Sequence, residues 1–145
     1  MSLADIDWRD RAGDDPALTG GVAGTLIALL ARLVDLGGRI AHFDEGRVAY
    51  WALEYAETGS ISYRYIVHGP LVQYVDAYLF QILGTGDAVM RLPIAVFGGL
   101  LPLSALLFRE HLRDSEIVAL AIVLAANPVL LYFSRFFRST LLVAG

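Results

Sequence analysis

Cysteine and lysine are both absent from this chain of 145 residues. Without cysteine, disulfide frameworks, thiolate metal sites and cysteine nucleophiles are all excluded. The 11 basic residues are therefore all arginines, and 15 acidic residues outnumber them to give a net charge of −4. A nucleic-acid-binding protein needs a basic surface to displace counterions from phosphates, so we expect no nucleic-acid partner. An acidic chain without lysine also suggests an organism adapted to high salt, a halophile.

Apolar residues are abundant, at 57% of the chain, and the mean hydropathy is +0.58. Water-soluble domains of this size are usually less apolar, which makes the lipid bilayer the expected solvent. Three stretches are apolar and long enough to be membrane spans, at about residues 20–40, 88–108 and 116–134. We therefore predict an all-α integral membrane helical bundle, a multi-pass protein of the cell membrane in contact with membrane lipids.

A further apolar run begins at Leu141 and stops at Gly145, which we interpret as the start of a fourth helix. Crossing a bilayer takes about 20 residues, so we expect C-terminal helices or partner membrane subunits to complete the bundle. We expect no catalytic turnover from these residues alone. Within the first span, Arg32 and Asp35 are one turn apart, and pairing on one helix face would lower the cost of both charges in lipid.

The remaining regions are a polar N-terminal tail, residues 1–19, and an external loop, residues 42–86, that holds six of the seven tyrosines. The loop has no uncharged run long enough to span, but it has two amphipathic patterns. We predict two interfacial helices there, with their aromatic residues at the headgroup layer. The expected apolar faces are Val48, Trp51, Ala52 and Tyr55 in the first helix, and Leu71, Tyr74, Val75, Tyr78 and Ile82 in the second.

Asp44 and Glu45 form a carboxylate pair where the first span is expected to leave the membrane. Two adjacent carboxylates can bind a divalent cation or accept a proton from a hydroxyl group. The alternative is structural: Asp44 would cap a helix that begins near Gly46, with Glu45 in the first turn, where the helix dipole favours acids. The spacing leaves both interpretations open.

Three other residues are candidates for binding an anion or a metal. His68 lies in a rigid His-Gly-Pro turn, where it could ligate a metal or donate to a phosphate, or could simply be exposed. Arg135 and Arg138 lie three residues apart just beyond the third span, and on a continuing helix they would share a face. Such a pair can bind phosphate oxygens bidentately, or it can anchor the span at the interface.

Four motifs follow one another in a distinctive order and spacing within residues 32–145. They are His42-Phe43-Asp44-Glu45, Tyr65-Ile66-Val67-His68-Gly69-Pro70-Leu71, Arg91-Leu92-Pro93 and Asn127-Pro128-Val129-Leu130-Leu131-Tyr132-Phe133-Ser134-Arg135-Phe136-Phe137-Arg138. This order resembles the N-terminal part of the archaeal flippase-activity-associated membrane proteins. That family is similar in turn to the protein mannosyltransferase and aminoarabinose transferase group of GT-C glycosyltransferases.

The resemblance implies a membrane glycosyltransferase, of which this chain is an N-terminal portion. Such an enzyme takes a sugar from a polyprenyl-phosphate-linked donor at the outer membrane face. The family pattern implies that Asp44 is the catalytic carboxylate, with Glu45 beside it. It also implies that Arg135 and Arg138 contact the carrier phosphate. Orientation rests on the same resemblance, because arginines occur in every loop: the external loop and residues 134–140 lie outside, and residues 109–114 inside.

The resemblance further places Tyr65 and His68 among the substrate-binding residues, and Glu45 and His68 become candidate ligands of a divalent metal ion. His68 stands where the transferases commonly have an acidic-Lys-Pro sequence. Thr140 stands where many relatives carry an acid, which argues against a second carboxylate there. Two alternatives are a non-enzymatic membrane subunit that assists the flipping or presentation of lipid-linked sugars, and a truncated gene product without activity.

Overall fold

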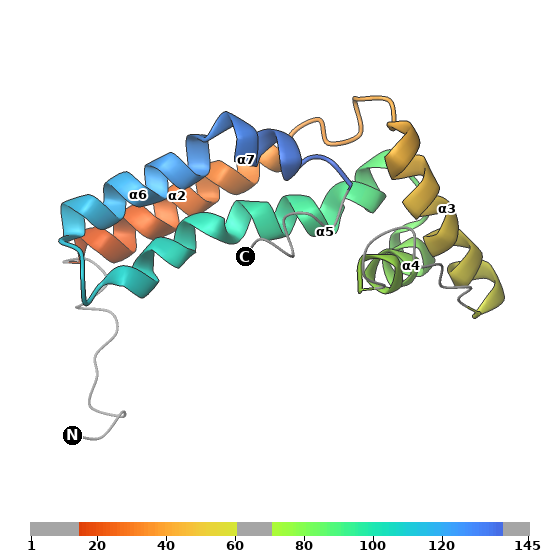
Figure 1. The fold of residues 1–145 in the computed structure, drawn as a ribbon, viewed down its shortest axis with the longest axis horizontal. Coiled ribbons are helices and arrows are strands. Elements are labelled where there is room, and N and C mark those ends of the chain that lie inside the picture. Colours follow the sequence, from red (N-terminus) through yellow and green to blue (C-terminus); the bar gives the residue numbers. More distant parts are fainter. Residues whose placement is uncertain (1–14, 61–70, 138–145) are drawn as a thin grey trace, which may run out of the picture.

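The computed structural model describes residues 15–60 and 71–137, and every regular element within these ranges is a helix. The elements are α2 (Pro16–Leu33), α3 (Phe43–Thr58), α4 (Leu71–Leu83), α5 (Asp87–Leu100), the 3₁₀ helix η2 (Leu101–Phe108), α6 (Asp114–Ala126) and α7 (Pro128–Phe133). The predicted all-α class is confirmed for this part of the chain. Helices α2, α5 with η2, and α6 pack along their lengths, while α3 and α4 lie at one end of that bundle (Figure 1).

Helix α2 begins at Pro16, inside the segment that we expected to be a polar tail. The Asp15 side chain caps it by accepting from the Leu18 amide at 2.9 Å, and Pro16 suits the first helical turn because that turn needs no N–H. The helix ends at Leu33, seven residues before the expected bound of 40. Asp35, with φ of 53°, follows in the left-handed region and turns the chain away from the helix axis.

The expected pairing of Arg32 with Asp35 is wrong, because Asp35 lies beyond the end of the helix. Arg32 is completely buried and donates instead to neutral oxygens. Its Nε donates to Ser134 Oγ at 2.8 Å, and its Nη1 donates to the carbonyl oxygens of Ala28 and Ala125 at 3.1 and 3.2 Å. Arg32 therefore joins α2 to the ends of α6 and α7.

The second predicted span agrees closely with the structure, because α5 and η2 form 22 continuous residues from Asp87 to Phe108. The last eight residues, from Leu101, form a 3₁₀ helix, and Pro102 in its first turn has no backbone N–H to donate. Gly98 and Gly99 allow α5 to approach its neighbours, since a side chain at Gly99 would overlap Leu29 of α2. Among the described residues, α2 and this α5–η2 helix are the two that are long and apolar enough to cross a membrane.

The prediction of one continuous helix over residues 116–134 is wrong, because the helix is interrupted at Asn127. Asn127 adopts ψ of 119°, and its Oδ1 accepts from the amides of Val129 and Leu130 at 2.9 and 3.1 Å. Pro128, at the start of α7, cannot donate to the preceding turn. The result is a helix of 13 residues followed by one of six. The expected fourth helix, from residue 141, lies outside the described residues.

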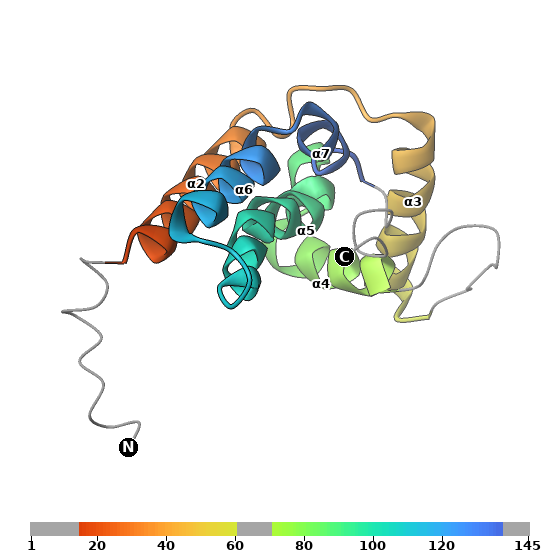
Figure 2. The ribbon, with the colours of Figure 1, turned by 60° about the vertical axis from the view of Figure 1, so that its left-hand side comes forward.

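The two helices expected in the external loop are confirmed as α3 and α4. Val48 and Ala52 of α3 are buried in a shared hydrophobic core. The other core residues come from α4 (Val72 and Phe80), from α5 (Met90 and Ile94) and from the segment after α7 (Phe137). Figure 2 shows α3 and α4 packed together beside the end of α5. The predicted apolar face of α4 is exposed instead, with exposed fractions from 38% at Val75 to 64% at Tyr78.

Candidate functional site

The start of α3 is organised by a capping box that differs from the expected cap. His42 is the N-cap, and its Nδ1 accepts from the Asp44 amide at 3.3 Å. Glu45, at the third helical position, accepts from the His42 amide at 2.9 Å. The prediction that Asp44 caps a helix beginning near Gly46 is therefore wrong, because the helix begins three residues earlier, at Phe43.

Glu45 is completely buried and connects four parts of the chain. Its Oε1 accepts from Arg91 Nε at 3.0 Å and from the Phe137 amide at 2.8 Å. Its Oε2 accepts from Arg91 Nη2 at 3.1 Å and from the His42 amide. Arg39 Nη2 lies 2.9 Å from both oxygens. One carboxylate thus holds together α3, α5, the α2–α3 connection and the segment after α7.

These contacts also fix the charge of Glu45. Burial alone would raise the pKa of this carboxyl group, but the Arg91 hydrogen bond and the Phe137 and His42 amides outweigh burial and lower it. The carboxylate therefore stays ionised and faces five N–H donors. Such a donor set does not suit a divalent cation, which would have to displace two guanidinium groups. Within residues 15–60 and 71–137, no group of three or more His, Asp or Glu residues could hold a metal ion.

Asp44, the residue immediately before Glu45, is half-buried. Successive residues of an α-helix point about 100° apart, so the two carboxylates leave the helix in different directions. The predicted pair is therefore divided by the helix: Glu45 points into the packed junction, and Asp44 lies on a neighbouring face.

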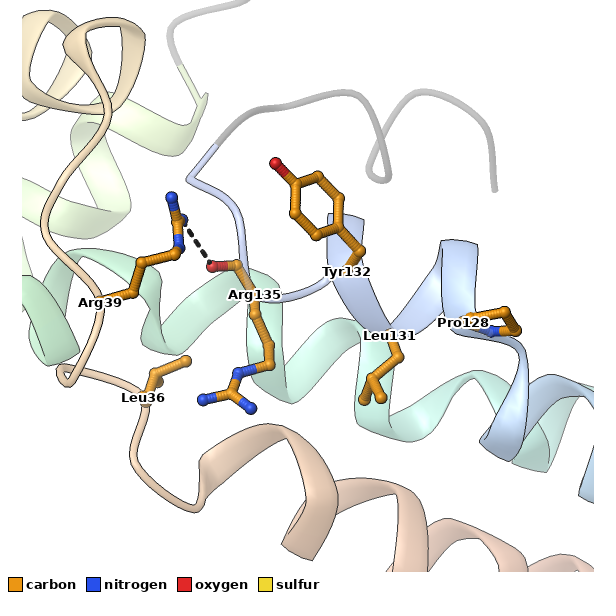
Figure 3. A pocket seen from close by; sticks show the side chains of 6 residues that line it. All are labelled: Leu36, Arg39, Pro128, Leu131, Tyr132 and Arg135. Atoms are coloured by element: carbon orange, nitrogen blue, oxygen red, sulfur yellow. Dashed lines mark hydrogen bonds between the residues drawn. The ribbon is translucent and has the colours of Figure 1, made fainter.

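A cavity of about 390 Å³ lies beside this junction, between the end of α2 and α7 (Figure 3). Its lining consists of Leu36, Arg39, Pro128, Leu131, Tyr132 and Arg135. Arg135 donates from Nη2 to the carbonyl oxygens of Val34 and Asp35, just past the end of α2, at 3.0 and 2.8 Å. The Asp35 oxygen also accepts from the Gly38 amide at 3.2 Å. The side chain of Arg39 is 43% exposed, and its Nη2 approaches the Arg135 carbonyl oxygen at 3.4 Å.

Phe136 connects the cavity to the start of α3. The Arg39 guanidinium carbon lies 5.3 Å from the centre of the Phe136 ring, a cation–π arrangement. The same ring lies 5.7 Å from the His42 ring and 6.1 Å from the Tyr132 ring, with which it stacks. His42 is two residues from Asp44, so this aromatic contact places the acid pair and the arginine cavity at the same end of the bundle.

The structure thus brings together Asp44, Glu45 and Arg135 of the predicted site residues. Tyr65, His68 and Arg138 lie outside the described residues. Arg39 was not predicted, although its position six residues before Glu45, at the end of the first apolar stretch, was a usable signal. Comparisons with protein-family models, with curated proteins and with solved structures found no match.

Proposed function

We propose that this chain is the N-terminal part of a GT-C-like membrane glycosyltransferase that uses a polyprenyl-phosphate-linked sugar as donor. The observation that carries the proposal is the cavity between the end of the apolar helix α2 and α7, whose wall includes both Arg39 and Arg135. Arginine forks suit phosphate oxygens, and an apolar bundle suits a polyprenyl tail. The motif order described above supports the same family.

In this proposal, α2 and α5–η2 each cross the bilayer, and α6 with α7 forms a third crossing interrupted at Asn127. Helices that cross a bilayer are expected to have their ion pairs near the ends of the bundle, where the headgroups lie. Asp15 and Arg109 pair at one end of the bundle, and Glu45 and Arg91 pair at the other. The 22 residues of α5–η2 extend roughly 35 Å, which fits a hydrocarbon core of about 30 Å. The exposed apolar face of α4 then lies in the outer headgroup layer.

The proposed reaction is an inverting transfer. Asp44 removes the proton from an acceptor hydroxyl, and the hydroxyl oxygen attacks the anomeric carbon of the donor sugar. The bond from that carbon to the carrier phosphate oxygen breaks, and the phosphate leaves with its negative charge against Arg39 and Arg135. Glu45 holds the Arg39 side chain in place. Arg138, Tyr65 and His68 are further proposed donor contacts, and no step uses a metal.

Photo-crosslinking tests the binding part of this proposal. The chain, reconstituted in lipid nanodiscs, is irradiated with a photoreactive polyprenyl phosphate, and the labelled peptides are identified by mass spectrometry. We expect label on residues 34–42 and 128–137, and a loss of labelling of about tenfold in the double variant Arg39→Ala, Arg135→Ala. The matched control is Arg109→Ala, Arg113→Ala, which removes two arginines from the opposite end. Equal labelling of both double variants would contradict the proposal.

A second experiment separates an enzyme from a subunit that only presents the lipid-linked sugar. Asp44→Asn is introduced into the complete membrane protein or its complex, and binding and sugar transfer are both measured. A general base predicts unchanged crosslinking with transfer reduced by about 10²–10⁴-fold. Sugar transfer at the wild-type rate would show that Asp44 is not the general base, and it would favour the alternative that the chain is a subunit that only presents the lipid-linked sugar.

A further inference from the structure

Arg32 is a buried cation without a charged partner. Its side chain is completely buried, and its Nη2 has no hydrogen-bond partner among the described residues. The contacts that it does make are to a hydroxyl oxygen and two carbonyl oxygens, all of them neutral. No Asp or Glu within residues 15–60 and 71–137 forms an ion pair with it.

The sequence offers few other counter-charges. Residues 61–70 and 138–145 contain no acidic residue, and the four remaining acids precede Pro16, whereas Arg32 is next to the last residue of α2. A buried charge is normally strongly destabilising unless a charged partner compensates it. In a membrane helix, an ionisable residue of this kind indicates a functional site whose partner should be named.

Arg32 is connected to the wall of the arginine cavity through Ser134. Ser134, which accepts from Arg32, precedes Arg135 in the chain and donates to the Leu131 carbonyl oxygen at 3.0 Å. Leu131 and Arg135 both line the cavity, as does Leu36, four residues after Arg32. Ser134 therefore links the uncompensated charge of Arg32 by hydrogen bonds to Leu131, which lines the cavity.

We propose that Arg32 is an electrostatic determinant of this cavity, which makes the cavity select a lipid that carries a phosphate. Arg32 does not touch the ligand; its charge acts across the apolar wall, where the low dielectric weakens it little. Arg39 and Arg135 make the direct contacts, and Arg32 supplies the third positive charge. The inference rests on the proposed function, because it names the charge selectivity of the same site.

The test compares two probes that differ only in charge, polyprenyl phosphate and the uncharged polyprenol. Each displaces the photoreactive probe from the wild-type chain and from Arg32→Gln in nanodiscs. Gln keeps a donor for Ser134 but removes the charge, so we expect binding of polyprenyl phosphate to weaken about tenfold and binding of polyprenol to change less than twofold. Arg109→Gln, the same change at the opposite end of the bundle, should alter neither.

Two further variants keep the test decisive. Arg32→Lys retains the charge and should bind polyprenyl phosphate within about threefold of wild type. Arg32→Met, which fills the space without polar atoms, replaces the Gln variant if circular dichroism and gel filtration show that Gln does not fold. A folded Lys variant that no longer prefers the phosphate would overturn the proposal, because hydrogen-bond geometry rather than charge would then matter.

The outcomes are distinguishable. Equal binding of the two lipids by the wild-type chain would contradict both the proposed function and this inference. If the wild-type chain prefers the phosphate and the neutral variants keep that preference, the inference about Arg32 is contradicted, while the proposed function is not. Equal weakening of both lipids in those variants assigns Arg32 a purely structural role and also overturns the inference.

Discussion

Replacing Glu45 tests whether its carboxylate is structural or chemical. In Glu45→Gln, one oxygen becomes an NH₂ group that faces the N–H donors of Arg91 and the His42 or Phe137 amide. Arg91 is 1% exposed and would lose its counter-charge. Removing one partner of a buried ion pair costs about 3–5 kcal/mol, because the other charge stays buried. Arg39 adds little to this cost, since its side chain is 43% exposed and can be solvated.

The expected loss is large enough to measure by thermal unfolding of the purified chain in detergent. For a chain of this length, a loss of 3–5 kcal/mol should lower Tm by roughly 10–15 °C. Glu57→Gln, an exposed acid on the same helix, is the control and should change stability by less than about 0.5 kcal/mol. The double variant Glu45→Leu, Arg91→Met should be more stable than the sum of its single changes predicts, because it removes both buried charges together.

The pH dependence follows from the same contacts. The pKa of Glu45 is lowered in the folded protein, so its stabilising contribution is present above the unfolded pKa of about 4. That contribution should disappear as the pH falls through the lower folded pKa, and Glu45→Gln should flatten this part of the acid titration. A Gln variant with unchanged Tm and a wild-type acid titration would refute a structural role for Glu45.

Three other outcomes are expected. Burial raises the pKa of Asp76 to about 8, so its contribution to stability should fall between about pH 4 and 8, and Tm measured at pH 5 and 9 should show that Asp76→Asn removes the decline. Asp44→Asn should shift Tm by less than 2 °C, because Asp44 is not the helix cap; a larger fall would show that Asp44 is structural. Single cysteines at Ser60 and Leu112 should report topology, with an impermeant reagent labelling only position 60 on intact cells and the reverse pattern inverting the bundle.

The sequence predicted helices where local patterns determine them. The bounds of the helix expected at residues 88–108 agree with the structure within one residue, and both amphipathic patterns in residues 42–86 are helices. The break at Asn127 was missed because the prediction of a span over residues 116–134 rested on its apolar composition, which does not show where a helix is interrupted. The Asn127 side chain, which accepts from two following amides, stabilises a new helix start there instead.

The site was harder to predict because its contacts are distant in sequence. Glu45 pairs with Arg91, 46 residues away, and accepts from Phe137, 92 residues away. Local spacing suggested a helix cap or a metal site at the acid pair, but it carried no information on these partners. The Arg32 pairing was misjudged for a related reason, since it assumed that the helix continued past Leu33.

The division of the acid pair has a chemical consequence for the proposed mechanism. A carboxylate that accepts from five N–H donors has a stabilised negative charge, and this stabilisation makes Glu45 a weak base. Asp44 is half-buried, and Phe136 contacts both His42 at the same helix end and Arg39 of the arginine cavity. In the proposed mechanism, Glu45 therefore orients the helix end and Arg39, and Asp44 is the residue proposed to transfer the proton. Removing Glu45 should impair both residues at once, whereas Asp44→Asn should impair the chemistry alone.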